Sequence, residues 1–158
     1  MAMSDIVTAE QGRRKLVTSR FFVWNHTDSS ALIVPDRTFI RPSPDELSQF
    51  VHETWFEFYE YMKEVFDCDD FALEALGYSR QLYVRDLVLM FNATAKEEIA
   101  DRKFEYPWFI GEGHGWIAGK NNHAANWSWC DDNKLYIIEP QNDRIRERTT
   151  DNCWYVRV

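Results

Sequence analysis

The spacing of hydrophobic residues divides this chain into a helical first part and a β-rich second part. Between residues 44 and 66 apolar side chains recur every three or four positions, which predicts one long amphipathic helix. Ser43, Pro44 and Glu46 mark its start, because they form a capping-box pattern with proline at the first helical position. After residue 106 the apolar residues fall in short runs separated by turn residues, a pattern typical of strands.

A second helix is predicted to begin at Cys68. Asp67 can cap it, and Asp69 and Asp70 suit the first turn, where the helix dipole favours negative charge. Gly77 is expected to end this helix. Partial alternation over residues 82–91 then predicts a strand, and residues 94–101 are predicted to form another short helix.

The remaining segments complete an α+β fold with helices packed on an antiparallel sheet. Residues 1–18 are expected to form an N-terminal arm or a short helix, and strands are predicted at 21–24 and 31–34, separated by a turn at 25–30. A chain of 158 residues has a typical length for one domain, here residues 1–158. The later strands are predicted at residues 107–110, 115–118, 123–130, 135–139 and 153–158, with a hairpin turn at 131–134.

Composition narrows the classes of partner. The 18 basic and 26 acidic residues give a net charge of −8, which disfavours nucleic-acid binding because phosphate contacts need a positive surface. Acidic mimicry of nucleic acid is a weaker alternative. No run approaches the ~18 apolar residues of a membrane helix, and no secretory segment precedes the three cysteines. We therefore expect a cytoplasmic protein with free thiols, while its oligomeric state stays open.

Cys68, His123 and Glu139 follow the order thiol, imidazole, carboxylate. A helix start helps to lower the pKa of a cysteine thiol. Counting outward from the turn at 131–134 places Glu139 opposite residues 122–124 of the adjacent strand, where its carboxylate could orient the imidazole. The three residues are therefore candidates for a catalytic triad.

The aspartates around the cysteine complicate this chemistry. Asp67, Asp69 and Asp70 are anionic and oppose ionisation of the thiol, unless a bound cation neutralises them. Their oxygens suit a hard ion such as calcium, although helix capping explains the same residues. The chemistry itself requires no cofactor.

Other side chains are candidates for supporting roles. Gln141 follows the strand-ending Pro140, and its amide could stabilise an oxyanion or contact a substrate. Asn126 and Trp127, on the predicted strand of the histidine, are further candidates for substrate contact. His114, in a glycine-rich stretch, is the alternative base.

Three blocks of the sequence resemble a known family. The blocks are Asp-Cys-Asp-Asp-Phe-Ala from Asp67, Asn-His-Ala-Ala-Asn from Asn122 and Glu-Pro-Gln from Glu139. Together they resemble phage and bacterial proteins related to the C-terminal, papain-like protease domain of a fungal agglutinin, the Marasmius lectin. The cysteine block is more distantly similar to transglutaminase-like cysteine peptidases. Asn122 stands where the family has glycine, and Met62 stands where papain-like enzymes often carry glutamine.

The resemblance implies a papain-like fold with Cys68 as nucleophile, His123 as base and Glu139 as orienting acid. It also implies calcium dependence, since the agglutinin domain is a calcium-dependent protease. Two functions are compatible with these residues. One is a cysteine hydrolase or peptidase that cleaves or transfers an amide acyl group of a protein or peptide substrate. The other is a catalytically inactive papain-like binding protein, such as a phage accessory or host-interaction protein.

Overall fold

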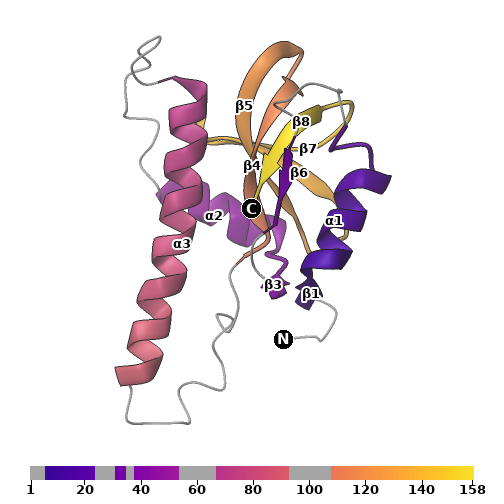
Figure 1. Cartoon of the computed structure of the whole chain (residues 1–158). Coiled ribbons are helices and arrows are strands. Elements are labelled where there is room, and N and C mark those ends of the chain that lie inside the picture. Colours follow the sequence, from indigo (N-terminus) through magenta and orange to yellow (C-terminus); the bar gives the residue numbers. More distant parts are fainter. Residues whose placement is uncertain (1–5, 24–30, 35–37, 54–66, 93–107) are drawn as a thin grey trace.

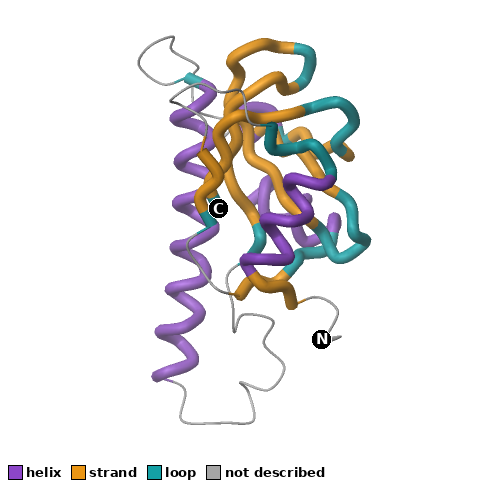
Figure 2. The backbone as a smooth tube through the Cα atoms, turned by 45° about the vertical axis from the view of Figure 1, so that its right-hand side comes forward, coloured by secondary structure: helices purple, strands orange, loops and turns teal. Residues whose placement is uncertain are grey.

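A central sheet separates two groups of helices (Figure 1). The computed structural model describes residues 6–23, 31–34, 38–53, 67–92 and 108–158. Helices α2 (Pro44–Glu53) and α3 (Cys68–Asn92) pack on one side of the sheet, and α1 (Ala9–Thr18) packs on the other. Figure 2 shows the same separation of α3 from α1 in a second view. The predicted α+β class is confirmed.

The sheet has six strands in the order β2-β8-β4-β5-β6-β7. All neighbouring pairs are antiparallel except β2 and β8, which are parallel. Two short strands, β1 (Ile6–Thr8) and β3 (Thr38–Ile40), form a separate antiparallel pair. The six strands are β2 (Ala31–Ile33), β4 (Ile110–Ile117), β5 (Lys120–Trp129), β6 (Leu135–Glu139), β7 (Arg144–Glu147) and β8 (Asn152–Arg157), and a 3-10 turn, η3 (Pro140–Asn142), joins β6 to β7.

Both faces of the sheet are buried. On the α1 side, Trp127 is fully buried and its ring meets Phe21 and Phe109 edge-on, with both pairs of ring centroids 5.4 Å apart. On the other side, Ile110 and Ile138 pack against α2. Because neighbouring residues of a strand point to opposite faces, β5 and β6 supply side chains to both layers. The residues of α2 in this second cluster are Leu47, Phe50 and Val51.

The glycines of β4 allow close packing in the first layer. A Cβ at Gly113 would lie 2.7 Å from Cys153 Sγ and 3.3 Å from the Trp127 ring, so no side chain fits there without a shift. The Trp127 indole N–H donates to the carbonyl of Glu112 at 3.0 Å. A large ring on β5 thus fills space that the glycines on β4 leave free.

The predicted capping box at the start of α2 is confirmed. The Ser43 N–H donates to the Glu46 carboxylate at 2.8 Å, and the Glu46 N–H donates to Ser43 Oγ at 3.2 Å. Residues 9–18 form α1, the helical alternative for the N-terminal segment. The rest of the long predicted helix, over residues 54–66, lies outside the described residues, as do the predicted turn at 25–30 and helix at 94–101.

The predicted end of the second helix at Gly77 is wrong. Helix α3 begins at Cys68 as predicted but continues to Asn92, so residues 82–91 are helical rather than a strand. A glycine inside a helix costs only about 1 kcal/mol, and the following turns contain several strong helix formers, namely Leu, Gln, Arg and Met. The buried side chains of Phe71 and Ala75 anchor the first turns.

Two strand predictions also change. Residues 107–110 and 115–118 were predicted as separate strands, but one strand, β4, runs from Ile110 to Ile117. The predicted strand at 21–24 is not a strand over its described residues 21–23, where Phe22 makes an isolated bridge to Cys153. Among the described residues, no helix is both long and apolar enough to span a membrane.

Candidate active site

His123 and Glu139 form a buried pair on neighbouring strands. His123 lies on β5, and Glu139 is the last residue of β6. His123 Nε2 is 3.0 Å from Glu139 Oε2 and 3.3 Å from Oε1. The two residues are only 7% and 9% exposed, so water competes little for this contact. The structure therefore brings together the imidazole and carboxylate that the hairpin register predicted to be neighbours.

The register explains how this pair meets. Asn126 is the Cα partner of Ile138, and continuing that register places Ala125 across from Glu139, one residue beyond the predicted range of 122–124. His123 and Ala125 share a face of the strand, so Glu139 reaches His123 diagonally. The Cα partner of His123 on β4 is Gly115, whose missing side chain lets the backbone of β8 approach closely, since a Cβ there would clash with the carbonyl oxygen of Asn152.

Cys68 is the first residue of α3 and is half-buried. The backbone N–H of Ala124, the residue after His123, lies close enough to the Cys68 sulfur to lower the pKa of the thiol. Burial raises the pKa of the Cys68 thiol, the Ala124 N–H opposes this rise, and the charges of Asp67 and Asp69 add to it. The net effect is a raised pKa, so this thiol stays protonated until a base removes its proton.

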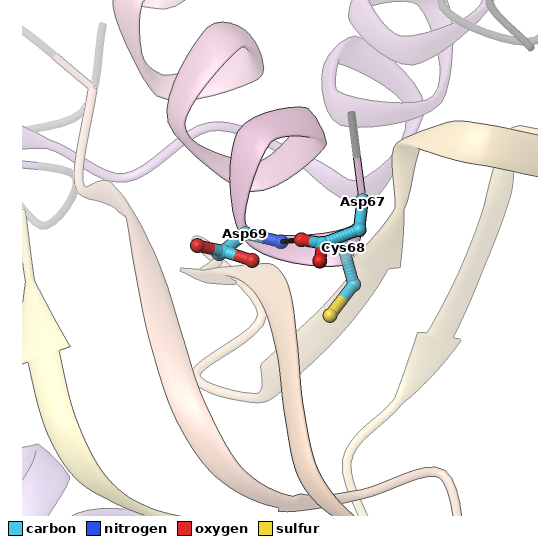
Figure 3. Close-up of side chains that lie close together, drawn as sticks. All are labelled: Asp67, Cys68 and Asp69. Carbon is cyan, nitrogen blue, oxygen red and sulfur yellow. Dashed lines mark hydrogen bonds between the residues drawn. The ribbon is translucent and has the colours of Figure 1, made fainter. Parts of the chain in front are cut away.

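The aspartates cap the start of α3. The Asp69 N–H donates to Asp67 Oδ1 at 3.4 Å, the bond drawn in Figure 3, and the Asp67 N–H donates to Asp70 Oδ2 at 3.1 Å. These bonds satisfy backbone groups that a helix start leaves without partners. The hydrogen bond with the Asp67 side chain raises the pKa of Asp69.

The same residues were predicted to hold calcium. Asp67, Cys68 and Asp69 place one candidate ligand atom each within 4.8 Å of one another. Calcium takes about six to eight oxygen ligands, whereas this group offers two carboxylates and a sulfur, and one Asp67 oxygen already accepts a backbone N–H. Asp69 and Asp70 would contribute oxygens, but these residues alone do not fit a calcium ion.

The remaining predicted residues lie at different depths. Gln141 is half-buried in η3, which packs against α3. Asn126 is fully buried, and its amide donates to two backbone carbonyls. Trp127 is fully buried in the first core layer. A substrate contact for any of them stays a prediction, and for Asn126 and Trp127 burial places the side chain in the protein interior.

The alternative base, His114, has different surroundings. It lies on β4, and its ring packs edge-on against Tyr155 with centroids 5.2 Å apart. It lines a pocket of about 350 Å³ together with Asp69, Asp70 and Glu112. The short histidine–carboxylate contact belongs to His123, not to His114.

Two features of the site were not predicted. One is the backbone N–H of Ala124, which has no sequence signal of its own. Pro140 gives only an indirect signal for this N–H. Strand β6 ends just before the proline, so the pairing of β6 with β5 goes no further than Asn126. The other is an ion pair in the pocket between the buried Glu112 and the half-buried Arg157, with Arg157 Nη2 2.8 Å from Glu112 Oε1.

The architecture has counterparts among solved structures. The fold is similar to that of PSL1a. The PSL1a–E64 complex matches with a TM-score of 0.69 and 19% sequence identity over 98% of this chain. A lectin from Polyporus squamosus, solved with the human-type influenza-binding epitope Neu5Acα2-6Galβ1-4GlcNAc, matches with a TM-score of 0.63 and 18% identity, also over 98% of this chain.

The chain spans half the length of both of these proteins, since the match covers 50% of each. At this level of identity the likeness establishes the fold alone, and it confirms the predicted papain-like α+β architecture. No protein-family model matches the sequence, and a comparison with curated proteins finds no match either.

Proposed function

We propose that this chain is a cysteine hydrolase that cleaves an amide bond of a protein or peptide through a thioester. The observation that carries the proposal is the buried His123–Glu139 pair, with 3.0 Å between Nε2 and Oε2, and Cys68 at the start of α3 supplies the nucleophile that we assign to this pair. The Ala124 N–H, on the strand of the base, lies close enough to Cys68 Sγ to lower the pKa of the thiol, which places the thiol near that strand. The fold likeness to PSL1a, solved with E64, adds support.

The first step is proton transfer and attack. Because Glu139 occupies Nε2 of His123, Nδ1 is the atom that takes the proton from Cys68 Sγ. The sulfur then forms a bond to the carbonyl carbon of the amide, and the carbonyl oxygen becomes an oxyanion. Glu139 holds the tautomer with Nδ1 unprotonated and stabilises the imidazolium that forms.

The second step releases the products. When the tetrahedral intermediate collapses, the C–N bond breaks and the amine leaves with the proton from His123. Water then attacks the thioester, His123 takes its proton, and the acid leaves as the Cys68 thiol is restored. The Cys68 N–H at the helix start and the Gln141 amide are the donors we assign to the oxyanion.

One observation favours the alternative of an inactive binding protein. Burial and two neighbouring carboxylates raise the pKa of Cys68, which is the opposite of what a resting thiolate needs. The two functions differ in their dependence on the base. In the hydrolase, His123 removes the thiol proton and Cys68 is reactive; in the binding protein, loss of His123 leaves the reactivity of Cys68 unchanged.

The experiment is labelling with E64 and with iodoacetamide, read by mass spectrometry. We expect one E64 adduct on Cys68, and a labelling rate that falls at least tenfold in His123→Ala. Cys130 and Cys153 are fully buried, and burial raises the pKa of the Cys130 thiol to about 12. Slow labelling of these two cysteines therefore does not test the role of His123. The matched control is His114→Ala, which removes the alternative base. An unchanged Cys68 rate in His123→Ala would overturn the proposal.

A further inference from the structure

Asn126 joins three elements of the fold through one amide group. Its Nδ2 donates to the carbonyl of Ala72 at 2.8 Å and to the carbonyl of Gly111 at 3.2 Å. Ala72 lies four residues after Cys68 on α3, Gly111 lies on β4, and Asn126 itself lies on β5, three residues after His123. The amide thus links the helix of the nucleophile to the strand of the base.

The other described contacts between the start of α3 and the sheet are mainly apolar. Phe71, Ala72 and Ala75 are buried there at 1%, 0% and 1% exposure. Apolar packing is not directional, so it resists separation of the helix from the sheet better than sliding along it. Hydrogen bonds with fixed geometry set the position of the helix along its axis.

The unpaired side-chain oxygen of Asn126 indicates that the residue contributes through the hydrogen bonds that its amide nitrogen donates. Asn126 is fully buried, and its Oδ1 has no hydrogen-bond partner among the residues that the structure describes. A buried acceptor without a partner is destabilising. An alkyl side chain would avoid that cost but would supply no donors for the two carbonyls. We therefore take the two hydrogen bonds that the amide nitrogen donates to outweigh the cost of the unpaired oxygen.

We infer that Asn126 is a positioning residue for Cys68, holding the start of α3 in register with His123 rather than contacting substrate. This inference rests on the proposed function. A small slide of α3 would change how far Cys68 Sγ lies from the Ala124 N–H, and with it the position of the sulfur relative to the imidazole. Asn126 would then govern how readily the thiol loses its proton.

The chain offers a matched control in Ser128. It lies two residues further along β5 on the same face, is also fully buried, and donates to the carbonyl of Phe109 at 3.0 Å. Phe109 lies outside α3. Asn126→Ala and Ser128→Ala each remove buried donors, but only the first removes the link to the nucleophile's helix.

The test is the pH profile of iodoacetamide labelling at Cys68 between pH 5 and pH 9, with thermal melting to verify folding. We expect Asn126→Ala to shift the profile upward by about one pH unit and to slow labelling at pH 6 about tenfold, because one pKa unit is a tenfold change in thiolate. Ser128→Ala should stay within about twofold of the wild type. If Asn126→Ala does not fold, Asn126→Ser keeps one donor and should slow labelling about threefold.

Equal profiles for the Asn126 and Ser128 variants would overturn the inference, because a purely structural role lowers the melting temperature without moving the pH profile. A labelling rate of wild-type Cys68 that does not depend on His123 would overturn the proposed function and this inference with it. A reactive wild-type Cys68 with an unchanged profile in the Asn126 variant would overturn the inference alone.

Discussion

The two halves of the candidate site are built differently. On the sheet, His123 and Glu139 are buried and held at hydrogen-bond distance by strand pairing. At the start of α3, Cys68 is half-buried among carboxylates, and its thiol has a raised pKa. The difference indicates a preformed base and acid acting on a thiol that is neutral at rest. Ionisation would then occur with substrate binding rather than before it.

The largest effect is expected from removing the nucleophile. Cys68→Ala should lower amide hydrolysis by at least about 10³-fold, because no thioester can form without the sulfur. The change is measured as release of new amino termini from a denatured protein substrate. Cys130→Ala is the control and should leave the rate intact. Activity that survives in Cys68→Ala would mean that the α3 half of the site has no catalytic part.

The next largest effect concerns the sheet half. Glu139→Gln keeps the size of the side chain but removes the charge that orients and stabilises the imidazolium. We expect hydrolysis to fall roughly 10²-fold, with Cys68 labelling at pH 6 falling in parallel. Glu147→Gln, on the adjacent strand β7 and exposed, is the control. If the Glu139 variant keeps wild-type rates, the carboxylate has only a structural role, and the pair on the sheet is not a preformed base and acid.

A third prediction concerns the stability of the fold at low pH, because the two halves of the site can be compared only where the protein is folded. Burial alone would raise the pKa of Asp151, but hydrogen bonds from Arg146 and from the Ala118 N–H outweigh it and lower the pKa from 3.8 to about 2. Because the folded pKa lies below the unfolded one, this stability is present above pH 3.8 and is lost as the pH falls toward 2.

Asp151→Asn should therefore lower the free energy of unfolding by about 2 kcal/mol at pH 7. The difference from the wild type should vanish near pH 2. Urea unfolding at both pH values measures it. A variant as stable as the wild type at pH 7 would show that the Arg146–Asp151 pair adds nothing, and acid loss of activity could then be assigned to the site itself.

The smallest effect sharpens the account of the thiol. Asp69→Asn removes one of the charges that raise the pKa of Cys68, so labelling at pH 7 should become about two- to threefold faster. The Asp69 backbone N–H, which bonds to Asp67, remains in the variant. Glu74→Gln, exposed on the same helix, is the matched control. A slower Asp69 variant would indicate that the carboxylate assists ionisation.

Local patterns in the sequence were sufficient for the most informative contact. A short turn and an antiparallel hairpin fix which residues face each other, so Glu139 could be placed near His123 to within one residue of the observed register. Capping rules placed Cys68 at a helix start, where α3 begins. Both features depend on residues close together in the chain.

The features that the sequence did not reveal depend on more than a single local pattern. The extent of α3 beyond Gly77 depends on the sum of weak helix propensities, which outweighed one glycine and a short alternating pattern. The parallel pairing of Ala31–Ile33 with residues 155–157 joins segments more than a hundred positions apart, and no local pattern encodes it. The burial of Asn126 likewise follows from the packing of α3 on the sheet.

The glycines of β4 have a consequence for how this sequence can vary. At Gly113 the space that a side chain needs is already occupied by Cys153 and Trp127. A larger residue at position 113 is tolerable only if position 127 or 153 becomes smaller at the same time. We therefore expect these three positions to change jointly across distant relatives, and intermediates with one change alone to be rare. Pairs of compensating changes, rather than single identities, are the trace by which such relatives can be recognised.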